Sequence, residues 1–96
     1  MLTVYRKELV GGLNEVKLPV GSKVLRAAMS LSDNGKEVVS IWYQCDTENG
    51  MEDRRFVVYG TGADMSEIDG YIKEYIGTAF KSNRYAFHVY EVEKEY

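Results

Sequence analysis

The chain contains 96 residues, of which 45% are hydrophobic and 12% aromatic, and fifteen acidic side chains outnumber twelve basic ones to give a net charge of −3. This length suits one domain over residues 1–96 and is too short for two. The aromatic and β-branched content excludes a disordered chain. The acidic balance argues against nucleic acid as a partner, because proteins that bind its phosphates usually carry a basic face.

The N-terminus and the cysteine content bear on where the protein works. Charged side chains at Arg6, Lys7 and Glu8 interrupt the region where a signal peptide would need its apolar run. No stretch approaches the ~20 apolar residues of a membrane helix. Cys45 is the only cysteine, so neither an intrachain disulfide nor a thiolate zinc site can form. We therefore expect a cytoplasmic protein that does not contact membranes.

The first third of the chain predicts strands separated by turns. Leu2 to Val10 is rich in β-forming residues and ends at Gly11-Gly12, a strong break. Apolar residues alternate with charged ones from Glu15 to Leu18 and recur at every second position from Leu25 to Leu31, as in half-buried strands. The Asn34-Gly35 dipeptide is typical of a tight hairpin turn, because both residues tolerate positive φ.

The next segment, Val38 to Cys45, predicts a strand at the centre of a sheet, since both of its faces are substantially apolar. One face carries Val39, Ile41, Tyr43 and Cys45, and the other carries Val38, Ser40, Trp42 and Gln44. The polar run Asp46–Asp53 contains Asn49-Gly50 and predicts a second hairpin loop. A strand from Arg54 to Tyr59 follows, and glycines end it.

The segment Asp64–Glu74 carries conflicting signals. Apolar residues recur at helical spacing through Met65, Ile68, Ile72, Tyr75 and Ile76, and Asp64 with Glu67 resembles a capping box. Gly70 would cost such a helix about 1 kcal/mol relative to alanine, and Tyr75 to Phe80 also has the composition of a strand. We expect a short helical turn near Met65–Asp69, followed by extended chain.

The C-terminal part predicts another strand. Tyr85, Phe87 and Val89 alternate with Ala86, His88 and Tyr90. The turn Ser82-Asn83-Arg84 pairs this strand with the one before it, and the tail from Glu91 to Tyr96 is expected to fray. In total, about seven short strands predict an all-β fold with at most one helical turn, either an antiparallel sandwich or a small barrel.

His88 is the only histidine and the first candidate for acid–base catalysis. A catalytic histidine needs a nucleophile or an orienting acid beside it, whereas His88 alternates with core-type residues on a strand. We expect a half-buried, hydrogen-bonded side chain. Cys45 ends an apolar strand without a basic neighbour in the sequence, and this predicts a buried, inert thiol.

Two loops resemble ligand-binding motifs without meeting their requirements. Gly60-Thr61-Gly62 lacks the spacing and lysine of a P-loop and the third glycine of a dinucleotide fingerprint, so it predicts a tight turn with positive φ. Its amides remain free to meet an anion. The acidic loop Asp46–Asp53 has Met51 and Val57 where a calcium-binding EF-hand needs glycine and glutamate. We expect no cofactor and no metal site.

Aromatic side chains leave the most room for a binding surface. Tyrosine and tryptophan favour interfaces because they bury a large area and keep a polar tip; the alternative is that these rings fill a small β core. The aromatic residues in question are Tyr71, Tyr75, Tyr85 and Tyr90 in the last third, and Trp42, Tyr43 and Tyr59 in the middle. Arg54 and Arg55 point to opposite faces of their strand, so at most one joins a given patch, and Glu52 or Asp53 can pair with them. The candidate ligand- or partner-binding residues are Trp42, Arg55, Tyr59, Gly60, Thr61, Gly62 and His88.

Several segments, taken in order, carry a family resemblance: Val4–Leu9, Val16–Leu25, Ile41–Tyr43, Arg55–Gly62, Tyr75–Thr78 and Ala86–Glu91. Together they resemble a family of short phage and prophage proteins of unknown function. Members of that family often carry a histidine directly after the Gly-Thr-Gly run, where this chain has Ala63. The resemblance implies a phage or prophage origin and the cytoplasm of a bacterial host, and it attaches no catalytic role to any residue.

Three functions from different classes are compatible with these features. We expect first a non-catalytic binding protein that engages a host protein or a small ligand, with host modulation or counter-defence as the analogous role. The first alternative is an assembly component that associates with itself through exposed sheet edges or aromatic faces. The second, ranked last, is a small hydrolase that uses His88 with carboxylates brought near by folding.

Overall fold

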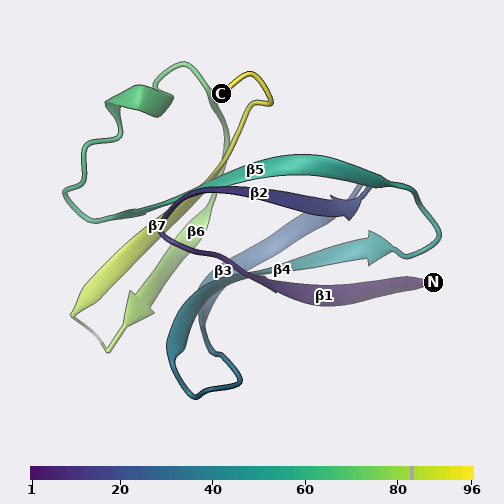
Figure 1. Cartoon of the computed structure of the whole chain (residues 1–96), viewed down its shortest axis with the longest axis horizontal. Coiled ribbons are helices and arrows are strands. Elements are labelled where there is room, and N and C mark those ends of the chain that lie inside the picture. The colour runs from purple at the N-terminus through teal and green to yellow at the C-terminus, as the bar shows by residue number, and fades with distance from the viewer. Residues whose placement is uncertain (83) are drawn as a thin grey trace.

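A computed structural model of the chain describes residues 1–82 and 84–96. Its elements are β1 (Leu2–Glu8), β2 (Gly12–Pro19), β3 (Lys23–Leu31), β4 (Glu37–Asp46), β5 (Met51–Gly60), the 3-10 turn η1 (Ser66–Ile68), β6 (Ile72–Lys81) and β7 (Tyr85–Val92). They form two antiparallel sheets, with strand orders β1-β4-β3 and β2-β5-β7-β6 (Figure 1). The predicted all-β antiparallel fold is therefore confirmed. Asn83, part of the predicted turn before the last strand, lies outside the described residues.

The main core lies between the two sheets. Side chains alternate between the two faces of a strand, so β4 turns Val39, Ile41, Tyr43 and Cys45 to the inside, where they meet Phe56, Val58 and Val89 of the other sheet. β4 lies between β1 and β3, which confirms the prediction of a central strand. The thiol of Cys45 is buried, as expected.

The sheets come closest where β3 passes β6. A Cβ placed on Gly77 of β6 would lie 3.4 Å from both the Cβ and the backbone nitrogen of Ala27 in β3. β6 pairs with β7 as predicted, with irregularities between Ile72 and Glu74 and between Tyr75 and Gly77. Such bulges bend a strand and increase its twist, which allows β6 to approach the other sheet here.

A second, smaller core covers the outer face of the four-stranded sheet. Ile68 of η1 is buried against Val57 of β5 and Val92 of β7. The helical turn predicted near Met65–Asp69 is confirmed as η1, and β6 begins at Ile72, so the helical spacing beyond η1 does not produce a helix. Strand pairing with β7 supplies the hydrogen bonds that a lone helix would have had to provide for itself.

The polar residues of this segment differ from the predicted capping box. The Asp64 carboxylate accepts hydrogen bonds from the backbone nitrogen and the hydroxyl of Ser66, at 2.9 and 2.6 Å. Glu67 does not return to the start of the turn but accepts a hydrogen bond from the Tyr59 hydroxyl at 2.7 Å. Tertiary contact with β5 therefore replaces the local cap.

Two further predictions are wrong. The loop that contains Asn49-Gly50 is not a hairpin, because β4 pairs with β1 and β3 while β5 pairs with β2 and β7, so the chain crosses between sheets there. The tail does not fray from Glu91, because β7 runs to Val92 and both residues are buried. Tyr96 packs against the second core.

In the described part of the chain, no helix is long and apolar enough to cross a membrane.

Candidate functional site

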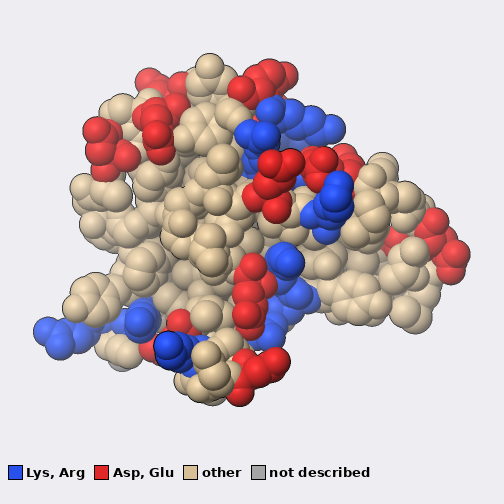
Figure 2. Space-filling model, in the orientation of Figure 1, with Lys and Arg blue, Asp and Glu red and all other residues tan. Residues whose placement is uncertain are grey.

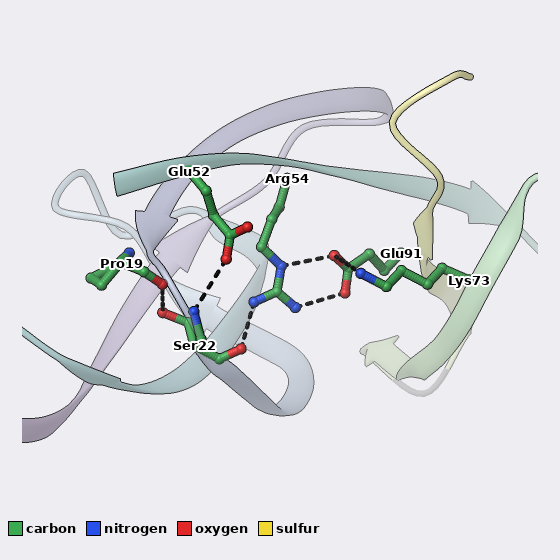
Figure 3. Close-up of polar contacts among 7 residues, drawn as sticks. Pro19, Ser22, Glu52, Arg54, Lys73 and Glu91 are labelled. Atoms are coloured by element: carbon green, nitrogen blue, oxygen red, sulfur yellow. Dashed lines mark hydrogen bonds and ion pairs between the residues drawn. The ribbon is translucent and has the colours of Figure 1, made fainter. Parts of the chain in front are cut away.

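The most deeply buried charged group is the carboxylate of Glu91, whose residue is only 2% exposed. Arg54 donates two parallel hydrogen bonds to it, from Nε to Oε2 at 2.8 Å and from Nη2 to Oε1 at 2.7 Å (Figure 3). Bidentate pairing is the strongest arrangement between a guanidinium and a carboxylate. The hydrogen bond to Glu91 is also the main cause that raises the pKa of Arg54 above its usual value.

This ion pair connects several segments at one end of the sandwich. Nη1 of Arg54 donates to the carbonyl oxygen of Ser22, in the turn between β2 and β3, and Nζ of Lys73 in β6 lies 3.9 Å from Glu91 (Figure 3). The Ser22 hydroxyl in turn donates to the Pro19 carbonyl at 2.6 Å, and Glu52 accepts from the Gly21 amide at 3.2 Å. Because all three guanidinium nitrogens of Arg54 already have partners, this assembly holds the scaffold together.

No motif in the sequence points directly to the pairing of Arg54 with Glu91. The interpretation that Glu52 or Asp53 pairs with Arg54 or Arg55 is wrong, because Arg54 binds Glu91 and Arg55 lies beside Glu15. The carboxylate of Asp53 instead binds Lys17 at 2.9 Å. The opposite directions predicted for Arg54 and Arg55 are confirmed, since Arg55 reaches the carbonyl oxygen of Tyr96 on the outer face. The available signal was the alternation of β7, which places Glu91 at an inward position that requires a buried cation.

The second polar assembly lies on the outer face of the four-stranded sheet, around His88. Nε2 of His88 lies 2.8 Å from the Thr61 hydroxyl and Nδ1 lies 3.1 Å from the Thr78 hydroxyl, while the Tyr75 hydroxyl lies 2.5 Å from that of Thr78. His88 is half-buried. The expectation of a half-buried, hydrogen-bonded histidine is therefore confirmed, and both of its ring nitrogens are engaged by hydroxyl groups.

Exposed aromatic side chains stand beside this assembly on the β6–β7 hairpin. Phe80, Tyr85 and Tyr75 are 65%, 59% and 52% exposed, and the ring of Tyr75 packs on Tyr90 at a centroid distance of 5.3 Å. A hollow of about 370 Å³ opens at the hairpin; its lining residues are Gly60, Thr61, Phe80, Arg84, Tyr85, Ala86 and Phe87. We call Tyr75, Phe80, Arg84 and Tyr85, together with Thr61 and His88, the hairpin surface.

The charge of the hairpin surface differs from that of the protein as a whole. The hairpin carries Lys81 and Arg84 in a chain of net charge −3, and basic side chains gather at the lower left of Figure 2, where Figure 1 places the hairpin. Acidic side chains gather at the upper left, over the segment that contains η1. The hairpin surface is thus a basic, aromatic region on an acidic protein.

Most of the predicted candidate residues lie at or near this surface. Tyr59, Gly60, Thr61 and Gly62 lie at the end of β5, next to His88 on β7, and Tyr59 pairs directly with His88. Gly62 has φ +87°, as the predicted turn requires, and the Thr61 amide donates to the Ala86 carbonyl at 3.1 Å. The Gly-Thr-Gly turn therefore shapes one wall of the hollow.

Tyr59, Arg55 and Trp42 do not join the hollow. Burial, followed by the hydrogen bond to Glu67, raises the pKa of Tyr59 well above its usual value, so this phenol stays neutral and ties η1 to β5. Arg55 lies further along β5, where its guanidinium is 3.5 Å from the Glu15 carboxylate. Trp42 lies on the other sheet, in a separate hollow of about 450 Å³ beside Val4.

Sequence reasoning missed two members of the hairpin surface, Phe80 and Arg84. Phe80 follows the buried Ala79, so it points to the outer face of the edge strand, where a large apolar side chain is unusual. The contrast between the small Ala79 and the large apolar Phe80 was visible in the sequence.

No group of three or more His, Cys, Asp and Glu side chains is arranged to hold a metal within residues 1–82 and 84–96.

Comparison with known proteins gives a family. No curated protein and no solved structure matches the chain significantly. One family model, described as a domain of unknown function (DUF7352), matches residues 1–96, the full length of the sequence. The chain therefore belongs to the DUF7352 family.

Proposed function

We propose that this protein is a non-catalytic binding protein, of phage or prophage origin, that engages a host protein through the hairpin surface in the cytoplasm of a bacterial cell. The observation that carries the proposal is the exposure of Phe80 and Tyr85 around one hollow, with Tyr75 also exposed on the same strand as Phe80. Aromatic residues and arginine dominate the binding energy of protein interfaces. The phage origin and a role in host modulation or counter-defence are supported by the family resemblance of the sequence.

The chemistry of the hairpin surface indicates what kind of partner it fits. A hollow of about 370 Å³ with aromatic walls suits one large apolar side chain. Lys81 and Arg84 favour acidic neighbours around that anchor, and such complementarity raises association rates and excludes basic partners. We therefore expect a protein segment with an apolar anchor flanked by aspartate or glutamate.

The state of the two nucleophile and base candidates supports a non-catalytic role. The ring nitrogens of His88 contact the hydroxyls of Thr61 and Thr78, and within residues 1–82 and 84–96 no carboxylate hydrogen-bonds to the ring to orient it, as the histidine of a catalytic triad requires. Cys45 is buried in the core, where a thiol is inert. A polar hydroxyl–imidazole network of this kind positions the neighbouring aromatic side chains.

Affinity capture from a bacterial lysate tests the proposal, with three forms of the protein as bait. The wild type and a Leu31→Ala/Met51→Ala control, which alters exposed apolar residues elsewhere, should enrich the same host protein. A Phe80→Ala/Tyr85→Ala variant should lose it. Equal enrichment by all three baits, or no enriched protein at all, would contradict the proposal. In a thermal-shift screen, a small ligand that stabilises the wild type but not the Phe80→Ala/Tyr85→Ala variant would indicate a small molecule as the partner instead.

A further inference from the structure

Strand β1 is the least buried strand of the sandwich. None of its residues is buried, and Leu2, Val4 and Tyr5 are 68%, 47% and 46% exposed. The strand is held by pairing with β4 over its whole length, and the ring of Tyr5 meets that of Tyr43 at a centroid distance of 6.3 Å. Exposed apolar side chains on both faces of an outer strand mark a surface suited to association.

The register shows which backbone groups of β1 are free. The Leu9 amide donates to the Val39 carbonyl at 2.8 Å, and the Thr47 amide donates to the Met1 carbonyl at 2.9 Å, both in the β1–β4 register. Hydrogen-bonded positions alternate along an antiparallel pair, so the odd-numbered residues of β1 bond to β4. The even-numbered residues turn their N–H and C=O groups to the open edge; they are Leu2, Val4, Arg6 and Glu8.

Two of the other outer strands, β3 and β6, are interrupted, whereas β1 is regular. β6 has two register shifts, and β3 has one between Val24 and Arg26 and also lies against β6. β2 ends in Pro19, which has no backbone N–H. Bulges, prolines and charged side chains are the usual means of preventing edge pairing. β1 has neither a bulge nor a proline along Leu2–Glu8, and its charged side chains are confined to the end that holds Arg6, Lys7 and Glu8.

We propose that β1 pairs antiparallel with β1 of a second copy, across a twofold axis at Tyr5, so that two three-stranded sheets become one of six strands. This register places Leu2 opposite Glu8 and Val4 opposite Arg6 of the second copy, which pairs the full strand and sets free backbone groups against free backbone groups. An axis at Arg6 would set the two copies of Arg6 opposite each other, and like charges in that position are destabilising. An axis at Val4 would leave Glu8 outside the pairing and shorten the paired strand.

Two observations favour a second copy over a foreign strand. One end of β1 carries Arg6, Lys7 and Glu8, with Glu8 3.5 Å from Arg6, and its net charge is +1. At the other end, Asp46 and Glu48 flank the N-terminal ammonium at 3.1 and 3.8 Å, and the net charge is −1. A twofold axis brings each basic end beside the other copy's acidic end, so the surface is complementary to itself. The exposed Val4 also continues into the apolar hollow beside Trp42, which lengthens the apolar strip that the second copy covers.

Light scattering across micromolar to millimolar protein tests this pairing. The wild type should reach twice the 11.0 kDa mass of the chain, and Val4→Pro should stay monomeric. The proline removes an N–H that faces the open edge, so pairing with β4 remains, and proline is tolerated at such positions. The Phe80→Ala/Tyr85→Ala variant should still form the dimer, which keeps this test separate from that of the hairpin surface.

Cysteine cross-linking gives a second readout that does not depend on the proline variant folding. In a Cys45→Ala background, Tyr5→Cys should form a disulfide-linked dimer on oxidation, because facing Cβ atoms at the axis lie about 4.5–5.5 Å apart. Lys17→Cys, on the exposed face of β2, is the matched control and should not. A wild type that is monomeric at every concentration, a folded Val4→Pro that still dimerises, or equal cross-linking at Tyr5→Cys and Lys17→Cys would each overturn the proposal.

Discussion

The guanidinium of Arg54 and the carboxylate of Glu91 face each other inside the sandwich, with Nε–Oε2 and Nη2–Oε1 distances of 2.8 and 2.7 Å. They join β5 to the C-terminal end of β7. The pair fixes the C-terminal end of β7, from which Val92 and Tyr96 reach the second core. At the other end, β7 carries His88 and Thr61 follows directly after β5, and both belong to the hairpin surface. The ion pair therefore stabilises the strands on which the proposed binding surface is built.

Removing one member of this pair should be far more costly than removing a surface ion pair. Arg54→Met removes both hydrogen bonds to the buried Glu91 carboxylate and leaves only Lys73 at 3.9 Å. A loss of about 3–5 kcal/mol is expected in the free energy of unfolding. Lys17→Met, which breaks the exposed pair with Asp53, should cost about 0–1 kcal/mol. Urea unfolding measures both. The double variant Arg54→Met/Glu91→Leu should recover part of the loss, and a single variant as stable as the surface control would contradict this assignment.

The contact between Gly77 and Ala27 should make residue 77 intolerant of side chains. Gly77→Leu forces β6 away from β3, and overpacking of this kind costs about 1–3 kcal/mol or more. Gly11 has open space around its Cα and no positive φ, so Gly11→Ala should be neutral or stabilising by about 0.4–1 kcal/mol. Thermal unfolding of the two variants provides the comparison, and equal melting temperatures would argue against a tight β3–β6 contact.

Ile68 should carry most of the contribution of the η1 segment to stability. Its side chain is fully buried against Val57 and Val92, and Ile68→Ala should cost about 2–5 kcal/mol. Leu31→Ala removes an equally apolar but exposed side chain and should change the free energy of unfolding by less than about 0.5 kcal/mol. Proteolysis should cut the Ile68→Ala variant first within residues 61–71, and an unchanged cutting pattern would show that η1 does not depend on this residue.

Acid should destabilise the protein through Asp46 and Asp64. Hydrogen bonds from the Glu48 amide and the N-terminal ammonium lower the pKa of Asp46, and those from Ser66 lower the pKa of Asp64. A carboxyl whose pKa is depressed in the folded state contributes stability above its unfolded pKa of 3.8, and this contribution is lost as the pH falls through the lower folded value. We therefore expect the melting temperature to fall as the pH is lowered below about 4.

The double variant Asp46→Asn/Asp64→Asn keeps the acceptor oxygens and removes both charges. Its melting temperature should be lower than that of the wild type at neutral pH and should change less on acidification. A wild type and a variant with parallel pH profiles would show that other groups govern the acid response.

Much of the fold could be predicted because the deciding signals are local. The continuous apolar character of Val38–Cys45 predicts a strand directly, and the glycines after β5 predict a turn. Strand partners could not be predicted in the same way, since Asn49-Gly50 has the composition of a hairpin turn and yet joins two different sheets. The sequence of a turn does not state which strands lie beside those that it connects.

The site could be predicted only in part, because residue type is a local signal whereas the position of a side chain in the sheets is not. Thr61 and His88 were candidates by residue type, and the structure brings them together. Trp42 was also a candidate by residue type but lies on the other sheet, beside Val4. The burial of Glu91 was missed because a buried carboxylate is stable only beside a cation, and its partner Arg54 lies 37 residues away in the sequence.

The most direct test of the account is the affinity of the captured host protein for the hairpin surface, measured by titration calorimetry. Phe80→Ala/Tyr85→Ala should raise Kd by at least about 30-fold, which corresponds to the roughly 2 kcal/mol that one interface hot spot contributes to the binding free energy. Leu31→Ala/Met51→Ala should leave Kd within about twofold. A hairpin variant that is folded and binds with unchanged Kd would contradict the central claim that this surface is the binding site.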